Sequence, residues 1–316
     1  MSSILETLFM IISAVELIVG ILGNGFIVLV NSIDWIRNRK VSLIDCILTC
    51  LAISRICLLW VIILNSRLNV CEILFYCRNT VALIFQDLWL GSNYFSTVCN
   101  TCLNVFYFLR IANFSNPIFL WMKWRIHRVL LIIVLGPTFC LFTCFLLNET
   151  LLIKLWEDQV NMEENTTCIF VRNMYAFMTS QSLLGMAFIF LFLVSLASFL
   201  LLILSLCNHT RQMKLQGTRS RGPSTEAHIR AIRAMISFLL LFVVYYLSSS
   251  LMVLTHGITH SVMAKMSANV LMFFYPSFHS LLLILWNNKL KEASFCVLRK
   301  LKCAWNQGNP HSHKIP

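Results

Sequence analysis

Seven long apolar stretches divide this chain, and each is long enough to form a helix that crosses a lipid bilayer. They cover residues 8–30, 44–64, 81–109, 129–147, 182–206, 234–254 and 268–286. A helix needs roughly 20 mostly apolar residues to cross a hydrocarbon core of about 30 Å. The chain is 58% hydrophobic and only 12% charged, which excludes a soluble core as the explanation. We therefore predict an all-α membrane protein: a seven-transmembrane helix bundle that forms one domain over residues 1–316, with a cytoplasmic tail from residue 287.

The charges between these windows predict the orientation. If the N-terminus is extracellular, the segments 34–43, 110–128, 207–233 and 287–316 are cytoplasmic and hold 19 of the 25 Lys and Arg residues. Such an excess of cations on the inner side is the positive-inside pattern. Anionic lipid of the inner leaflet then accounts for the net charge of +12, and no nucleic acid is needed. We predict a multi-pass protein of the plasma membrane whose partners include membrane lipid.

Few residues precede the first window, and no basic segment is among them, so we expect no cleaved signal peptide. Such a short exterior terminus leaves no ligand-binding ectodomain. A small-molecule site is therefore expected among the helices or the outer loops.

Four N-x-S/T sequons are sorted by this orientation. Asn148 and Asn165 are exterior, whereas Asn113 and Asn208 are cytoplasmic and out of reach of the glycosylation machinery. Asn165 lies in mid-loop and is the better acceptor, because Asn148 is at a helix end.

The cysteines suggest no metal site, since the chain has no His/Cys cluster and no HExxH motif. We expect no metal and no cofactor. Only Cys71, Cys77 and Cys168 are exterior, and a disulfide among them stays open. Cys296 and Cys303 flank a basic amphipathic stretch and are candidates for palmitoylation.

Arg55 lies about eleven residues into the second window, near mid-bilayer. A charge there costs roughly 2.5–3.5 kcal/mol on insertion scales, so Arg55 must face other helices. Asn24 of the first window is its expected partner. The alternative is an interhelical staple without a ligand role.

The third window is the most polar, and its polar residues recur every three or four positions on one helical face. They are Gln86, Trp89, Asn93, Thr97, Asn100 and Asn104. Trp89 and Asn93 are one turn apart near the outer end, where an aromatic face beside an amide suits a small-molecule contact. The alternative for the deeper residues, Asn100 and Asn104, is hydrogen bonding between helices.

Two cytoplasmic segments carry further patterns. Residues 222–226 break the chain and start a helix whose basic entrance at the cytoplasmic face includes Arg230 and Arg233. After residue 287, apolar and basic residues alternate near helical spacing, which favours an amphipathic helix on the inner leaflet over a plain basic tail.

Several motifs resemble those of the bitter taste receptors (taste receptor type 2), a family of G-protein-coupled receptors. The rhodopsin-like DRY and NPxxY motifs are missing, and the matching segments are residues 23–27 (GNGFI), 51–55 (LAISR), 106–115 (FYFLRIANFS), 120–125 (LWMKWR), 204–206 (LSL) with His209, 223–228 (PSTEAH) and 279–290. They stand in register over residues 20–290. The vomeronasal type 1 receptors are the nearest similar family, and these motifs favour the taste receptors.

Three positions depart from the resemblance. Leu191 stands where many members have proline, so a kink there is in doubt. Val98 replaces a frequent tryptophan, and Trp286 replaces a small residue.

The resemblance implies a receptor that binds bitter small-molecule agonists and activates a heterotrimeric G protein of the gustducin class, followed by phospholipase C and calcium release. The residues it implies for agonist contact are Trp89, Asn93, Tyr245, Asn269 and Phe188. Those it implies for the switch or the G-protein side are Asn24, Arg55, Tyr107, Arg110, Ala112 and His209. We also expect Arg230 and Arg233, at the basic entrance of the sixth helix, to meet the G protein.

Two other classes of function fit the chain less well. A transporter predicts an internal repeat and broken helices at mid-membrane, and neither pattern is present. A membrane enzyme predicts acids or histidines that converge, whereas Glu16, Asp45 and Asp87 are scattered in depth. We therefore expect no catalytic residues.

Overall fold

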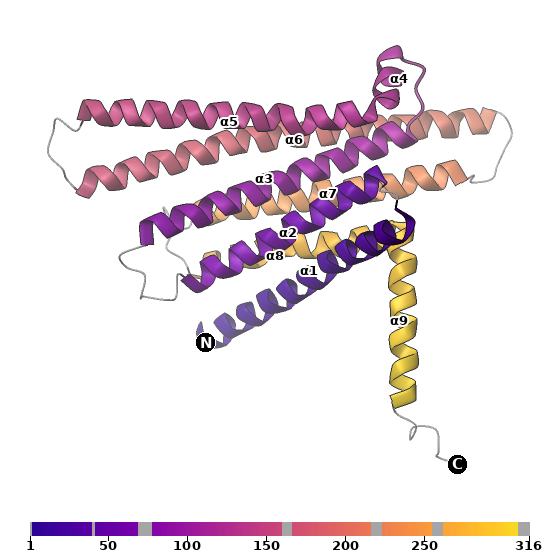
Figure 1. Cartoon of the computed structure of the whole chain (residues 1–316), viewed down its shortest axis with the longest axis horizontal. Helices are drawn as coiled ribbons and strands as arrows, with labels where there is room; N and C mark the ends of the chain where they lie inside the picture. Colours follow the sequence, from indigo (N-terminus) through magenta and orange to yellow (C-terminus); the bar gives the residue numbers. More distant parts are fainter. Residues whose placement is uncertain are drawn as a thin grey trace. The chain divides into compact units, whose positions relative to one another are not determined.

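The computed structural model describes residues 2–39, 42–68, 78–159, 166–215, 223–254 and 262–308. Within these ranges the chain is almost entirely helical and contains no strand (Figure 1). The helices are α1 (Ser2–Asn38), α2 (Leu43–Leu68), α3 (Arg78–Ile111), α4 (Pro117–Trp124), α5 (Ile126–Gln159), α6 (Thr166–Leu215), α7 (Pro223–Leu254), α8 (Val262–Trp286) and α9 (Asn288–Gly308).

All seven predicted windows lie inside separate helices, so the expected helix pattern is confirmed. The helices are longer than the windows, because a helix continues beyond the apolar part that hydropathy detects. The short helix α4 lies in a segment that sequence analysis treated as a connection. Asn116 begins it as the N-cap residue, with its side chain accepting from the amide of Ile118 at 2.8 Å, and Pro117 occupies the first turn.

In the described part of the chain, six helices are long and apolar enough to cross a membrane. They contain residues 7–38, 43–64, 126–143, 185–211, 228–248 and 266–286. The long helix α3 is not among them, because its polar stripe lowers the hydropathy of its described part. That result agrees with the polar character expected of the third window.

The helices form two compact units, each built from segments that are distant in the sequence. Unit 1 contains residues 1–71 and 232–316, and unit 2 contains residues 72–231. Unit 1 thus comprises α1, α2, most of α7, α8 and α9, whereas unit 2 comprises α3 to α6 with the beginning of α7. One domain over residues 1–316 remains a prediction.

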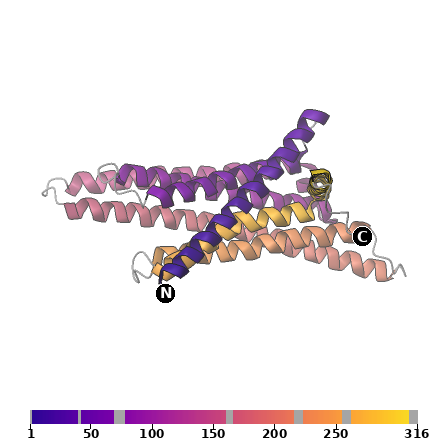
Figure 2. The same cartoon turned by 90° about the horizontal axis from the view of Figure 1, so that it is seen from below.

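In unit 1, α1 packs along α8, as Figures 1 and 2 both show. Gly20 and Gly23 of α1 face Ser277 and Ser280 of α8. A Cβ added to Gly20 would come within 2.8 Å of Cδ1 of Leu59, and one on Gly23 within 3.3 Å of Cβ of Ser280. Two glycines one turn apart therefore permit this close approach, as small residues do between membrane helices.

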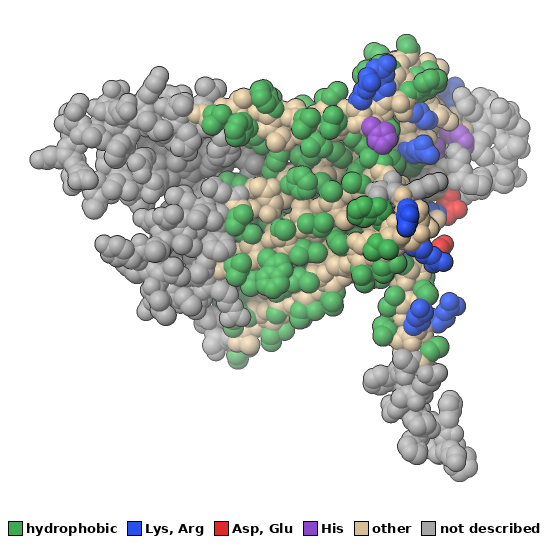
Figure 3. All heavy atoms as spheres, in the orientation of Figure 1, with side chains coloured by type: hydrophobic (Ala, Val, Ile, Leu, Met, Phe, Trp, Pro, Cys, Tyr) green, Lys and Arg blue, Asp and Glu red, His purple; other side chains and the backbone are tan. Residues whose placement is uncertain are grey.

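On the face that Figure 3 shows, hydrophobic side chains dominate the described residues, and basic side chains gather around α4 in unit 2 and along α9 in unit 1. The helix α9 confirms the amphipathic helix predicted after the seventh window. Phe295, Leu298 and Leu301 are exposed along it, and Nζ of Lys291 lies 5.9 Å from the ring centroid of Phe295. The alternative of a plain basic tail is wrong for the described part of the tail.

Candidate functional site

Arg55 of α2 is a fully buried charge in unit 1, with 0% of the residue exposed. A terminal guanidinium nitrogen bonds to Nδ1 of His279 in α8, and Cζ lies 5.3 Å from the ring centroid of Tyr275. Because a guanidinium group only donates, Nδ1 must accept, so the imidazole is neutral with its proton on Nε2. The burial confirms that Arg55 faces other helices and not lipid.

Asn24 of α1, the expected partner of Arg55, is used elsewhere. It is 0% exposed, and its amide nitrogen donates to the carbonyl of Gly20 at 2.8 Å and to that of Pro276 at 3.2 Å. The bond to Pro276 ties α1 to α8, whereas the bond to Gly20 stays inside α1. His279 takes the place that sequence analysis gave to Asn24.

Aromatic rings continue from this buried pair along α7 and α8. The ring of Tyr275 stacks on that of His279 at 6.2 Å, and the ring of Tyr245 lies 5.1 Å from that of Tyr275. The ring of Phe238 also lies near His279, at 6.0 Å between centroids. Tyr245, one of the predicted ligand residues, is therefore linked through Tyr275 and His279 to Arg55 inside one unit.

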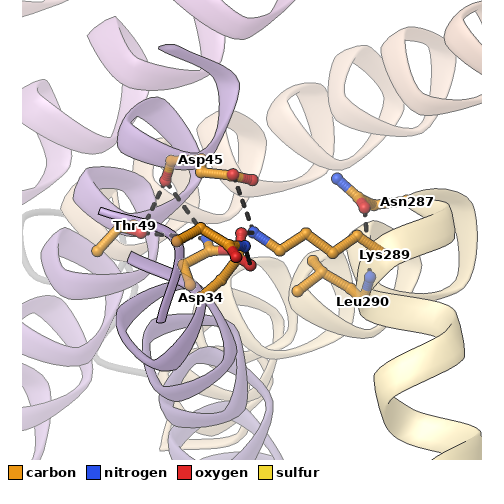
Figure 4. A network of polar contacts seen from close by, with 8 residues as sticks. Asp34, Asp45, Thr49, Asn287, Lys289 and Leu290 are labelled. Atoms are coloured by element: carbon orange, nitrogen blue, oxygen red, sulfur yellow. Dashed lines mark hydrogen bonds and ion pairs between the residues drawn. The ribbon is translucent and has the colours of Figure 1, made fainter. Parts of the chain in front are cut away.

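A second polar network ties the beginning of α9 to α1 and α2 (Figure 4). Nζ of Lys289 lies 2.6 Å from Oδ2 of Asp34 and 2.9 Å from Oδ2 of Asp45. Asn31 and Thr49 donate to the backbone carbonyl of Asp45 at 3.3 and 2.7 Å. One ammonium therefore joins two carboxylates from two helices.

The same network changes the proton affinity of Lys289. Partial burial by itself lowers the pKa of the Lys289 ammonium, but the hydrogen bonds and charges of Asp34 and Asp45 raise it by more. The pKa of Lys289 consequently lies above its ordinary value of 10.5. The ion pairs are therefore complete at neutral pH.

In unit 2, the polar stripe of α3 is buried, as predicted. Asn93, Thr97, Asn100 and Asn104 are each at most 4% exposed. Thr97 donates to the carbonyl of Asn93 at 3.0 Å, and Asn100 to that of Ser96 at 3.0 Å, so these bonds stay inside α3.

One link from α3 to α6 comes from Thr101, a residue outside the predicted stripe. The hydroxyl of Thr101 lies 3.4 Å from the carbonyl of Leu191, and Ser195 donates to Thr101 at 3.2 Å. Leu191 is fully buried there and keeps a backbone N–H that proline would lack.

Some of the predicted agonist residues belong to unit 2 and the others to unit 1. In unit 2, Trp89 is half-buried one turn before Asn93, and Phe188 of α6 is buried. In unit 1, Tyr245 is buried, whereas the side chain of Asn269 in α8 lies outside the described residues.

The predicted G-protein side of unit 2 is built where α3 ends. Tyr107 is half-buried, Arg110 is exposed, and Ala112 is 0% exposed. The backbone N–H of Asn113 donates to the hydroxyl of Ser205 in α6 at 3.1 Å, which fixes the chain as it leaves α3.

Two histidines meet near the junction of α6 and α7. The rings of His209 and His228 stack at 5.7 Å with an interplanar angle of 25°. Arg230 forms an ion pair with Glu226 one turn earlier, at 2.9 Å, and Arg233 is exposed.

Several predicted residues fall outside the described part of the chain. These are Asn165, Cys71 and Cys77, together with the side chains of Asn148 and Cys168. Asn113 and Asn208 are described and exposed, as are Cys296 and Cys303 on α9. Among the described residues, no three His, Cys, Asp or Glu side chains gather as metal ligands would.

Sequence reasoning gave no role to His279, Tyr275 or Lys289. One signal for His279 was available, because a buried arginine in one window requires a buried acceptor in another. His279 opens one of the quoted motifs and is a suitable acceptor.

Comparison with known proteins gives one family. A family profile described as "Taste receptor protein (TAS2R)" matches residues 1–302. Taste receptor type 2 member 8 of Homo sapiens is 41% identical over 305 residues, covering 94% of this chain and 98% of that receptor. Member 7 of Pongo pygmaeus is 41% identical over 310 residues, covering 95% of both chains.

These matches confirm the resemblance drawn from the motifs, and the transporter and enzyme alternatives are wrong. The expected seven-helix membrane architecture is that of the family as well. The chain therefore belongs to the taste receptor type 2 family of bitter taste receptors, which are G-protein-coupled receptors and not enzymes.

Proposed function

We propose that this receptor binds bitter small molecules among the outer halves of its helices, at the plasma membrane. It then activates a gustducin-type G protein, followed by phospholipase C and calcium release. The observation that carries the ligand site is the pair on α3, where Asn93 is 2% exposed and Trp89, one turn away, is half-buried.

This pair supports binding of a flat ligand that carries a polar group. The Trp89 ring contributes contact area and about 0.5–1.5 kcal/mol of stacking. A buried amide such as Asn93 disfavours poses that leave it unmatched by about 1–3 kcal/mol. Phe188, Tyr245 and Asn269 are proposed as further contacts.

Tyr245 supports a route from the ligand to the switch. Its ring packs on Tyr275, which stacks on His279, the partner of Arg55. A ligand that moves Tyr245 would disturb a buried pair that has no solvent to compensate it. To shift the receptor from mostly inactive to mostly active, ligands must bind the active state more tightly than the inactive state by about 5.5 kcal/mol of binding free energy. The agonist and the G protein must share this difference.

The residues proposed for the switch or the G-protein side are Tyr107, Arg110, Ala112, His209, Arg230 and Arg233. All but Tyr107 lie in the predicted cytoplasmic segments, where exposed Arg110 and Arg233 offer positive charge. The exposed apolar and basic residues of α9 support a further contact with anionic lipid of the inner leaflet.

The experiment uses cells that carry a gustducin-type chimera and a panel of bitter compounds. Trp89→Ala should raise the half-maximal concentration about tenfold or more for most agonists. Asn93→Ala should weaken only agonists that carry a polar partner. Phe95→Ala is the matched control, because this aromatic residue of α3 is 45% exposed.

Surface expression is measured through an N-terminal tag. Equal potency of every agonist in both variants, at equal surface level, would remove Trp89 and Asn93 from the site. A calcium response that persists without the co-expressed G protein would contradict the coupling.

A further inference from the structure

One lysine of α4 holds the end of α3 in unit 2. Nζ of Lys123 donates to the carbonyl of Ala112 at 2.9 Å and to the side-chain oxygen of Asn113 at 3.0 Å. Ala112 follows the last residue of α3 and is 0% exposed. The carbonyls at a helix end have no partner inside the helix, and they carry partial negative charge. The ammonium of Lys123 satisfies one of them and complements that charge.

A cluster of aromatic rings lies beside Lys123. Nζ of Lys123 lies 5.6 Å from the ring centroid of Phe119, which is 5% exposed. The Phe119 ring packs edge-on against Phe114 at 5.3 Å and against Phe108 at 5.4 Å. Phe108 belongs to α3, Phe114 to the connecting segment and Phe119 to α4. The three rings therefore pack α3, the connecting segment and α4 against one another next to the Lys123 ammonium.

Residues 112–116, which connect α3 to α4, are held by two further contacts. Asn116 caps α4, and the N–H of Asn113 donates to Ser205 of α6. Residues 112–116 are therefore held by α3, α4 and α6 without any regular structure of their own. The side chains of Arg110, Asn113 and Ser115 are exposed.

The environment of Lys123 differs from that of an ordinary surface lysine. Burial, with a smaller contribution from the nearby Arg110, lowers the pKa of the Lys123 ammonium. A lysine that only lay on a charged surface would lose little by pointing into water. Here the ammonium makes two hydrogen bonds to oxygens of the connecting segment.

We infer that Lys123 is a positioning residue for G-protein coupling, which fastens residues 112–116 so that the exposed groups around them meet the G protein in a fixed arrangement. This inference rests on the proposed function. Lys123 itself is half-buried and acts through the segment that it holds.

The test compares three variants of the full-length receptor in nanodiscs. Lys123→Met removes the donors and the charge, whereas Lys123→Arg keeps both. Arg128→Met is the matched control, because it removes one positive charge from an exposed residue just beyond α4. Lys123→Leu, which also lacks a donor and a charge, replaces the methionine variant if the latter does not reach the surface.

Two quantities are measured: amide hydrogen exchange of residues 112–116, and the Kd of the purified, nucleotide-free gustducin-type heterotrimer. Lys123→Met should accelerate the exchange and raise the Kd about tenfold, since two charge-assisted hydrogen bonds are lost. Lys123→Arg should restore most of both. Arg128→Met should change the Kd by no more than about twofold.

The outcomes separate the inference from the proposed function. If the wild-type receptor does not bind this heterotrimer, the proposed coupling is wrong, and the positioning role is wrong with it. If the wild type binds but Lys123→Met matches Arg128→Met in both measurements, only the positioning role is overturned. Faster exchange with an unchanged Kd would also overturn it, because the segment would then be held for stability alone.

Discussion

At the scale of single residues, the structure pairs groups that are far apart in the sequence. Arg55 and His279 are 224 positions apart, and Asn24 and Pro276 are 252 apart. Each pair places a strong donor against a buried acceptor, because in lipid an unmatched polar group costs several kcal/mol. The identity of the acceptor decides which substitutions the receptor tolerates.

We predict that His279→Ala weakens the receptor as strongly as Arg55→Ala does. Loss of the acceptor takes a hydrogen-bond partner from a buried guanidinium, at a cost on the order of 3 kcal/mol. His279→Asn should retain much of the function, since its side-chain oxygen can accept where Nδ1 did. Surface density, basal signal and agonist response are the measurements.

The asparagine variant is the control for this prediction. If His279→Ala and His279→Asn behave alike and both match wild type, the Arg55–His279 bond does not matter to the receptor.

At the scale of the helices, a few polar side chains and glycines decide how neighbouring helices are joined. Lys289 joins the beginning of α9 to α1 and α2, and Thr101 joins α3 to α6. Glycines set the spacing of α1 and α8, because a side chain at Gly20 or Gly23 would collide with Ser277 or Ser280. The places of the helices in the chain follow from hydropathy, whereas these junctions follow from a few side chains.

We predict that Lys289→Met lowers the thermal stability of the purified receptor at pH 7.5. Its effect should be smaller once Asp45→Asn is present, because only the Asp34 ion pair is then left to lose. The coupling between the two substitutions should be about 0.5–1 kcal/mol, because both partners keep some exposure. The matched control is Lys291→Met, because Lys291 lies two residues further along α9 and is exposed.

The pH dependence has a definite sign. The folded pKa of Lys289 is raised, so its contribution is complete below the ordinary value of 10.5 and is lost as pH rises through the folded pKa. The stability difference between wild type and Lys289→Met should therefore shrink above about pH 10.5. A difference that is absent at pH 7.5, or that grows in alkali, would contradict the ion pairs.

At the scale of the whole molecule, hydropathy and charge carry the strongest predictions. The polar face of α3 and the amphipathic α9 were both predicted and both observed. The orientation of the bundle stays a prediction, which depends on 19 cytoplasmic cations against five exterior ones.

We predict glycan on Asn165, little on Asn148 and none on Asn113 or Asn208. Only exterior sequons meet the glycosylation machinery. Asn165→Gln should abolish the glycosidase-sensitive gel shift, and Asn208→Gln serves as the cytoplasmic control. Loss of the shift in Asn208→Gln alone would mean that the orientation is inverted.

The sequence by itself determined the helices, the buried face of α3 and the family. These properties depend on local sums, such as apolar residues in a window or polar residues at helical spacing, and on motifs in register. Only the tertiary structure decided that Arg55 bonds to His279 and not to Asn24, that Lys289 bridges two aspartates and that Lys123 holds the end of α3. Such pairings depend on which helix faces meet and at what height, and hydropathy carries no information about either because it is blind to rotation and register between helices.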